Sequence, residues 1–330
     1  MTALTYEITA VPNGFDPSFK VRYPLGYAFE TPTHFVHYFG QKTSWHTVQN
    51  ELAISEGKSG TLEDWIKNTF GAKNITTMIN NVGDCIEGVW RPGLYNVDIV
   101  IDSLNYTEAE IRFAQQALRL LISKLDDLFL YIEPNGSGLS AYSHKTRELL
   151  LLACTELESY WRTYMDKVYG VFATSRYTTN DYIKLLPKLH LKDFEFGLTA
   201  FPSFPAEVPF GLWTSSSPTG SLPWYDSYNK IKHDKIGNFH LATLHYCISA
   251  VLANLAMFCA RFGPEPLFAD NNTFGMLVNQ HFYLNLKNPQ IESFYLNAVN
   301  IPSTVRLDLI PLSPGRNGYL LPFNSVPLTL

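Results

Sequence analysis

The chain has 330 residues, of which 46% are hydrophobic and 17% are charged, so it can bury a sizeable core. This composition excludes an intrinsically disordered chain. The formal net charge of −5 excludes broad coverage of nucleic acid by a basic surface, but it leaves room for a local basic patch.

Residues 1–105 predict a small mixed α/β module. Aromatic pieces at 27–29 and 34–39, separated by prolines, suit short strands, and residues 96–102 suit another. Thr61 is placed to cap a helix, with Asp64 three residues later. His34 and His37 are three residues apart and would face opposite sides of a strand, so we expect no metal there.

Two helices are predicted next. The first covers residues 107–132, with Thr107 as its N-cap and apolar residues at spacings of three and four. The second covers residues 143–168 and has a similar apolar seam. Its polar face carries Glu158 and Arg162 at positions i and i+4, where they can form an ion pair or take part in a site.

Residues 178–189 predict a short helix and residues 191–198 a strand. The segment 201–223 is rich in proline, serine, glycine and aromatic residues, and it brings Trp213 and Trp224 towards the next helix. Two interpretations are open: these aromatic rings stack on bases, or they pack over a pair of helices.

The stretch from Leu222 to Gly263 predicts one long helix with a polar first half and an apolar second half. Asn229 and His233 are four residues apart and therefore share a helical face, with Asp226 and Lys230 near the same stripe. This places an imidazole in a polar cluster at the exposed end of a core helix.

Residues 266–330 predict strands, at 282–286 and 304–310, that cover or join the first module. We therefore predict an α+β protein in three parts. They are a mixed α/β module at residues 1–105, a helical domain at 106–265, and a β-rich extension at 266–330, so that the helical part is an insertion between β-containing ends.

The two polar helices together resemble the HEPN superfamily of prokaryotic helical domains. The resemblance rests on Arg147–Arg162 and on Trp224–Lys235, and it covers roughly residues 140–265. Active members are metal-independent ribonucleases with an Arg, four to six residues and then a His, and many act as dimers in toxin–antitoxin, antiviral defence or CRISPR systems. The resemblance therefore implies a helical bundle, an RNA substrate, a homodimer and no cofactor.

His233 matches the family histidine and Asn229 its polar companion, but Asp226, Ser227 and Tyr228 occupy the positions that could hold the arginine. In such a site His233 acts as general acid or base, because imidazole titrates in the useful pH range. The cation that offsets phosphate charge must then come from a lysine or from another helix. Because lysine lacks the bidentate guanidinium fork, catalysis is weakened or lost.

The expected site has a catalytic set and a substrate-binding set. The catalytic set is His233, Asn229, Lys230, Glu158 and Arg162. The substrate-binding set is Lys232, Lys235, Asp226 and Trp224.

Three hypotheses remain open for this chain. It is a HEPN-like ribonuclease of defence or stress response, a non-catalytic HEPN-like module that binds RNA, a nucleotide or a protein, or a structural and assembly protein. A protein partner would bind through the N-terminal module. The four cysteines are far apart in the sequence, the first residues lack the pattern of a secretion signal, and the most apolar segment is shorter than the ~20 residues of a membrane span, so we expect a cytoplasmic protein.

Overall fold

The computed structural model describes residues 1–47, 52–93, 102–171, 176–234, 236–268, 272–304, 309–311 and 319–330. The chain is mixed α and β, as the sequence predicts, and it divides into two compact units. Unit 1 comprises residues 1–105 and 288–327, and unit 2 comprises residues 106–287 with 328–330. The strand expected at 96–102 lies almost wholly outside the described residues.

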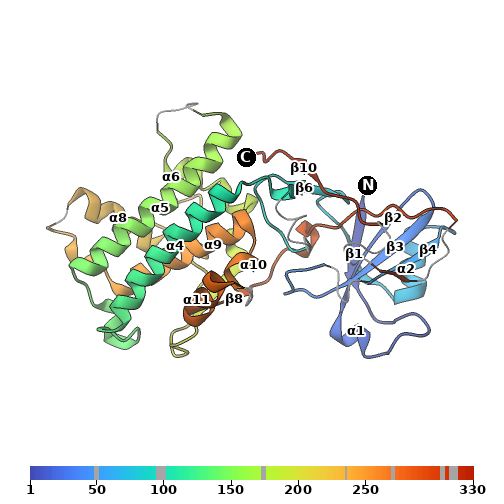
Figure 1. Ribbon diagram of the computed structural model, residues 1–330, viewed down its shortest axis with the longest axis horizontal. Coiled ribbons are helices and arrows are strands. Elements are labelled where there is room, and N and C mark those ends of the chain that lie inside the picture. Colours follow the sequence, from blue (N-terminus) through green and yellow to red (C-terminus); the bar gives the residue numbers. More distant parts are fainter. Residues whose placement is uncertain are drawn as a thin grey trace. The chain divides into compact units, whose positions relative to one another are not determined.

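Unit 1 is built on a six-stranded antiparallel sheet in the order β5-β1-β2-β3-β4-β9 (Figure 1). In its centre, Tyr27 pairs with Tyr38 across two strands of apolar and aromatic residues. The strands are β1 (Ala3–Glu7), β2 (Leu25–Glu30), β3 (His34–Gly40), β4 (Leu52–Gly57), β5 (Lys73–Thr77) and β9 (Leu309–Pro311).

Both faces of this sheet are buried. On one face Tyr27 and Tyr38 pack with Phe294, which comes from the C-terminal part of the chain. On the other face Phe39 packs with Phe70 of α2 (Leu62–Phe70). A short helix, α1 (Phe19–Arg22), precedes β2. Because side chains alternate along a strand, the unbroken run of buried residues in β3 supplies both cores.

The histidines of β3 take separate structural roles. His37 is fully buried, with its ring 3.8 Å from that of Phe70 and its Nδ1 2.6 Å from the Tyr6 hydroxyl oxygen. Burial lowers the pKa of His37 well below its ordinary value. The Nδ1 of His34 instead lies 2.8 Å from the Thr33 hydroxyl oxygen. His37 is therefore a residue of the core.

A second contact region joins the two ends of the chain inside unit 1. Strands β6 (Asp84–Ile86) and β10 (Asn324–Val326) pair in parallel. The Tyr38 hydroxyl donates to the backbone carbonyl of Asn297 at 2.7 Å, and the Tyr295 hydroxyl donates to that of Val89 at 2.9 Å. A turn of 3-10 helix, η4 (Ile291–Ser293), precedes these residues.

Unit 2 is built on α4 (Glu108–Phe129), α5 (His144–Tyr169) and α9 (Leu244–Phe262), which pack against one another (Figure 1). Capping boxes at Thr107 and Ser143 begin the first two helices, so both predicted starts are confirmed. The 3-10 helix η1 (Gly136–Ser140) joins them. Nearly all of α9 is buried, because it packs against α4, α5 and α8.

Smaller elements complete unit 2. Strand β7 (Phe194–Leu198) pairs antiparallel with β8 (Phe282–Leu286), and α11 (Thr273–His281) packs on α4. Residues 266–287 therefore belong with the helices and not with the extension expected to begin at 266. The remaining elements are α6 (Thr179–Tyr182), α7 (Leu185–Lys188), η2 (Leu191–Asp193) and α10 (Glu265–Phe268).

The prediction of a single long helix from Leu222 to Gly263 is wrong. Helix α8 (Pro223–His233) ends where Asp234 becomes extended, and the Asp234 carboxylate accepts from the backbone N–H groups of Ile236 and Gly237. A short 3-10 helix, η3 (Phe239–Leu241), follows. Thr243 then caps α9 by accepting from the backbone N–H of Tyr246. Local polar bonds thus interrupt a sequence whose apolar periodicity continues.

Among the described residues, α9 alone is long and apolar enough to cross a membrane. Within its most apolar window, 89% of the residues are buried in the protein. This pattern matches the central helix of a folded domain.

Candidate functional site

Helix α8 presents one face to the core and another to solvent. Pro223 occupies its first turn, where a missing N–H costs nothing, and Trp224 and Ile231 face inwards. Asn229 is half-buried and His233 is exposed on the opposite side. Among the described residues, the His233 ring forms no hydrogen bond and no ion pair. The imidazole of the expected catalytic set is therefore open to solvent.

The lysines of α8 each have a partner on their own helix. Lys230 Nζ lies 2.6 Å from a carboxylate oxygen of Asp226, four residues earlier. Lys232 Nζ donates to the Tyr228 hydroxyl at 2.9 Å, again four residues earlier. About half of each lysine side chain remains exposed, 52% for Lys230 and 50% for Lys232. Both ammonium groups can therefore still receive an anion from solution.

Glu158 of α5 lies beside α8. Its Oε1 accepts a 2.7 Å hydrogen bond from the Tyr225 hydroxyl, and its Oε2 is 3.9 Å from Lys232 Nζ. Burial and this bond to Glu158 raise the pKa of Tyr225 above its ordinary range, so the phenol stays protonated. The hydrogen bond to Tyr228 and the charge of Glu158 raise the pKa of Lys232. Glu158 thus joins α5 to α8.

The structure does not bring the whole expected site together. Arg162 Nε is 3.4 Å from a carboxylate oxygen of Asp166 on its own helix. Glu158 contacts Lys232, whereas Asn229 and His233 lie on the solvent face. Lys235 lies outside the described residues.

Trp224 does not take the expected substrate-binding position. It is 3% exposed, and its indole N–H donates to the backbone carbonyl of Pro209. Trp213 stacks on the buried Trp161 of α5 with ring centres 5.1 Å apart, and Tyr225 meets the same ring edge-on. The aromatic segment 201–223 therefore packs over the helices, which is the second of its two interpretations.

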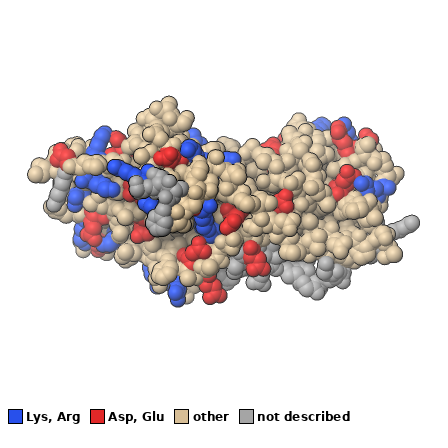
Figure 2. Space-filling model, turned by 90° about the horizontal axis from the view of Figure 1, so that it is seen from above, with Lys and Arg blue, Asp and Glu red and all other residues tan. Residues whose placement is uncertain are grey.

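A basic group surrounds the end of α8. The exposed side chain of Arg176 is close enough for its charge to lower the pKa of Lys232, although the other neighbours of that lysine raise it. Figure 2 shows Lys and Arg side chains in blue at the left end of the view, the end at which Figure 1 labels α8. We call this group the basic end of α8, and its members are Arg176, Lys230, Lys232 and His233.

A second polar cluster involves residues that the sequence did not single out as a site. His245 Nε2 is 2.5 Å from Glu207 Oε1, and the Ser249 hydroxyl donates to Glu207 Oε2 at 2.8 Å. The bond to Glu207 raises the pKa of His245 even though partial burial lowers it. The His245 and Ser249 spacing is a visible helical signal, but Glu207 comes from a loop 38 residues before His245.

This cluster borders a cavity of about 210 Å³ that Trp224 and Tyr246 also line. The carboxylate of Glu207 bridges His245 and Ser249, so the serine hydroxyl donates to the acid and not to the imidazole. A serine nucleophile activated by histidine instead donates its hydroxyl hydrogen bond to the imidazole. The arrangement is suited to holding a protonated imidazole at the edge of the cavity.

Comparison with known proteins adds no relative. The chain matches no family model, no curated protein and no solved structure.

Proposed function

We propose that unit 2 is a HEPN-like module that binds RNA through the basic end of α8. The observation that carries this proposal is the grouping of Lys230, Lys232 and Arg176 with the exposed His233 at one helix end. The free, buried cysteines suit a reducing compartment, so the proposal extends to a cytoplasmic protein.

The chemistry of this surface favours contact with phosphate groups. Lysine and arginine side chains neutralise backbone phosphates and release counterions, which supplies sequence-independent affinity. The aromatic rings of α8 itself, Trp224, Tyr225 and Tyr228, are buried and cannot stack on bases. We therefore propose a short contact with the RNA backbone, of modest affinity, that weakens steeply with salt.

Fluorescence anisotropy with a labelled single-stranded RNA tests this proposal, with EDTA present. We expect the Lys230→Ala/Lys232→Ala variant to bind several-fold more weakly than wild type at low salt. Each lost phosphate contact should lower the slope of log affinity against log salt by about 0.7. Lys67→Ala/Lys73→Ala is the matched control, because Lys67 also pairs with an acid four residues earlier, on α2, and both lysines are exposed.

Equal affinities for wild type and both double variants would reject the basic end of α8 as the RNA site. Equal losses in both variants would show a general charge effect instead. Thermal unfolding of each variant confirms that the comparison concerns folded protein.

A metal-independent ribonuclease is the second candidate. It is favoured by the position of His233 and Asn229 on the same solvent-facing side of α8. Arg162 pairs with Asp166 instead of joining this pair, so we propose that a second copy of the chain supplies the cation that HEPN-like catalysis requires.

Incubation of a mixed RNA pool with the purified protein in EDTA separates the two candidates. A ribonuclease should cleave, and His233→Gln should abolish cleavage while leaving RNA binding in place. Binding without cleavage by wild type, at concentrations where the chain self-associates, would leave the non-catalytic module. A chain that neither binds nor cleaves RNA would leave the structural and assembly hypothesis.

A further inference from the structure

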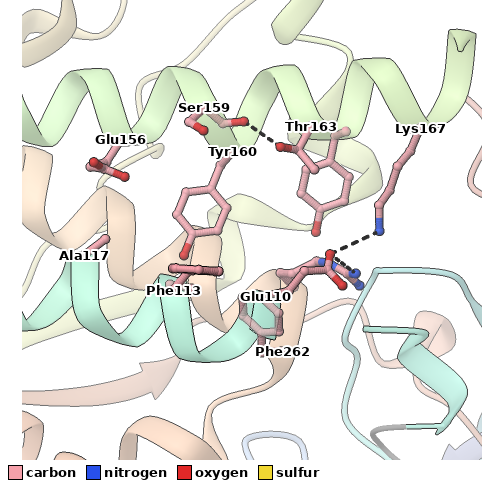
Figure 3. A pocket seen from close by; sticks show the side chains of 12 residues that line it. Glu110, Phe113, Ala117, Glu156, Ser159, Tyr160, Thr163, Lys167 and Phe262 are labelled. Carbon is pink, nitrogen blue, oxygen red and sulfur yellow. Dashed lines mark hydrogen bonds and ion pairs between the residues drawn. The ribbon is translucent and has the colours of Figure 1, made fainter. Parts of the chain in front are cut away.

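Glu110 and Glu207 each border a cavity of unit 2, and their positively charged partners differ. Glu110 borders a cavity of about 270 Å³ between α4 and α5 (Figure 3), and its Oε1 is 3.2 Å from Arg261 Nη2 and 3.8 Å from Lys167 Nζ. Both of these partners stay charged at neutral pH. Glu207 borders the cavity of about 210 Å³, and its partner is His245, an imidazole that can lose its proton near neutral pH. Of these two carboxylates, Glu207 is therefore the one whose positive partner depends on pH.

The carboxylate of Glu207 lies at the wall of its cavity. Its Oε1 is 2.5 Å from His245 Nε2, its Oε2 accepts from the Ser249 hydroxyl at 2.8 Å, and all three residues line the cavity. The side chain of Glu207 is 19% exposed and that of His245 is 44% exposed, so the cluster is open to small molecules. A carboxylate can accept about four hydrogen bonds, and each oxygen of Glu207 has one side-chain donor among the described residues. A donor inside the cavity can therefore bind to this carboxylate.

The remaining residues of the wall are mainly apolar. They are Val208, Pro209, Leu212, Leu222, Pro223 and Trp224, with Tyr246 beside the histidine. The indole of Trp224 is held in place by its 3.1 Å hydrogen bond to the carbonyl of Pro209. An apolar cavity of about 150 Å³ is large enough for benzene. A cavity of about 210 Å³ therefore has room for one ring with a short side chain.

The charge of Glu207 determines which ligand this cavity favours. A carboxylate beside apolar walls is unfavourable unless a positive charge compensates it. In the protein alone, the imidazolium of His245 supplies that charge, and its hydrogen bond to Glu207 raises the pKa of His245. An ammonium group in the cavity supplies the same charge without the imidazole proton. A ligand with a carboxylate would instead be repelled by Glu207.

We propose that this cavity binds a primary amine carried on one small apolar ring. The ammonium group donates to the carboxylate of Glu207, and the ring lies against the apolar wall. Binding releases the proton of His245 to solution, because two positive charges beside one carboxylate repel each other. The site contains none of the residues of the basic end of α8.

Benzylamine is a suitable probe, and protein labelled at its valine and leucine methyl groups allows binding to be followed by NMR at pH 8. We expect benzylamine to shift the methyl signals of Val208 and Leu222. The signals of Leu121 and Leu125 on α4, which do not line the cavity, should stay unchanged. Benzyl alcohol tests the ring without the charge and should bind at least about tenfold more weakly. Benzoate, which has the opposite charge, should bind more weakly still.

The affinity for benzylamine should fall as the pH is lowered through the pKa of His245. The ionisable residues that line the cavity are Glu207, His245 and Tyr246, and of these the imidazole titrates between pH 6 and 8. Competition with its proton predicts a loss of up to about tenfold per pH unit. The affinity for benzyl alcohol should stay constant over the same range. Because linkage is reciprocal, saturating benzylamine should lower the pKa of His245.

Two variants distinguish binding from a structural role. Glu207→Gln should reduce the affinity for benzylamine to that for benzyl alcohol, and it should leave benzyl alcohol unchanged. Glu195→Gln is the matched control, because the Glu195 side chain is 18% exposed, pairs with Lys287 and does not line the cavity. His245→Gln retains a donor for Glu207 and removes the competing charge. It should therefore bind benzylamine more tightly than wild type at pH 6 and lose the pH dependence, whereas loss of a structural histidine would weaken binding.

Thermal unfolding of each variant confirms that the comparison concerns folded protein. Equal affinities of wild type for benzylamine and benzyl alcohol overturn the proposal, since that result describes an apolar cavity only. Unchanged benzylamine affinity in Glu207→Gln overturns it as well, and so does a wild-type affinity that is independent of pH. The absence of any shift at Val208 and Leu222 up to millimolar benzylamine has the same meaning.

Discussion

The hydroxyl of Tyr225 on α8 donates a 2.7 Å hydrogen bond to Oε1 of Glu158 on α5. This bond ties the polar helix of the candidate site to the long helix beneath it, and the ring of Tyr225 packs edge-on against Trp161. The position of the basic end of α8 therefore depends on a contact between residues 67 positions apart in the sequence.

Tyr225→Phe and Tyr160→Phe should have opposite effects on stability. The first removes a hydrogen bond to a carboxylate and should lower the free energy of unfolding by about 1.5–3 kcal/mol. The second removes a buried hydroxyl without a partner and should leave that free energy unchanged or raise it by up to about 1 kcal/mol. Urea denaturation followed by circular dichroism measures both values. A destabilised Tyr160→Phe protein would contradict the unpartnered state of its hydroxyl.

Glu158→Ala should destabilise unit 2, because the buried Tyr225 hydroxyl loses its acceptor. We expect a loss of about 1–3 kcal/mol in the free energy of unfolding. Glu148→Ala on the same helix is the control, since its ion pair with Lys124 lies on the surface and should contribute at most about 1 kcal/mol. Similar losses in the two variants would show that Glu158 has no special connecting role.

The ion pair of His245 and Glu207 should make stability depend on pH. Because Glu207 raises the folded pKa of His245 above the ordinary 6.5, the pair stabilises the fold fully below about pH 6.5. That contribution is lost as the pH rises through the folded pKa. NMR titration of the His245 ring gives this pKa directly, and Glu207→Gln should lower it. If Glu207→Gln leaves the pKa of His245 unchanged, the ion pair is not the cause of the raised pKa.

Thr243→Ala should loosen the start of α9. The Thr243 hydroxyl accepts from the backbone N–H of Tyr246, and alanine leaves that donor without its cap. A cost of about 1 kcal/mol in the free energy of unfolding is expected. Thr163→Ala on α5 is a matched control, because its exposed hydroxyl bonds only to the backbone carbonyl one turn earlier. Equal effects would show that the break before α9 does not depend on this cap.

Short-range signals predicted much of the helical framework. Thr107 as an N-cap marked the start of α4, and the apolar seam placed the start of α5 at Ser143, because both signals extend over only a few residues. The structure completes a capping box at each start, with Glu110 and with Thr146. The break before α9 was missed for the opposite reason. The apolar spacing continues through the break, so hydrophobic periodicity gives no sign of it. The helix α8 ends because the Asp234 carboxylate accepts from the backbone N–H of Gly237, and a polar bond of this kind does not change the apolar pattern.

The contacts of the candidate site also divide into those that the sequence predicts and those that it does not. The pairing of Lys230 with Asp226 follows from helical spacing, so it was visible in the sequence. The partners of Glu158 and His245 come from other elements, and only the packing of those elements brings them together. The inward position of Trp224 likewise depends on the loop carbonyl of Pro209, which no local pattern identifies.

The bond between Tyr38 and Asn297 spans 259 residues, and it has a consequence for synthesis on the ribosome. Strands β1 to β5 are complete before residue 106 is added, but β9, which forms one edge of their sheet, follows residues 106–287 of unit 2. During translation the N-terminal strands must therefore wait, with one core face uncovered and one sheet edge unpaired, while about 200 further residues are made. A nascent chain in this state is a natural client for a chaperone, and a premature stop before β9 would leave that edge open to aggregation.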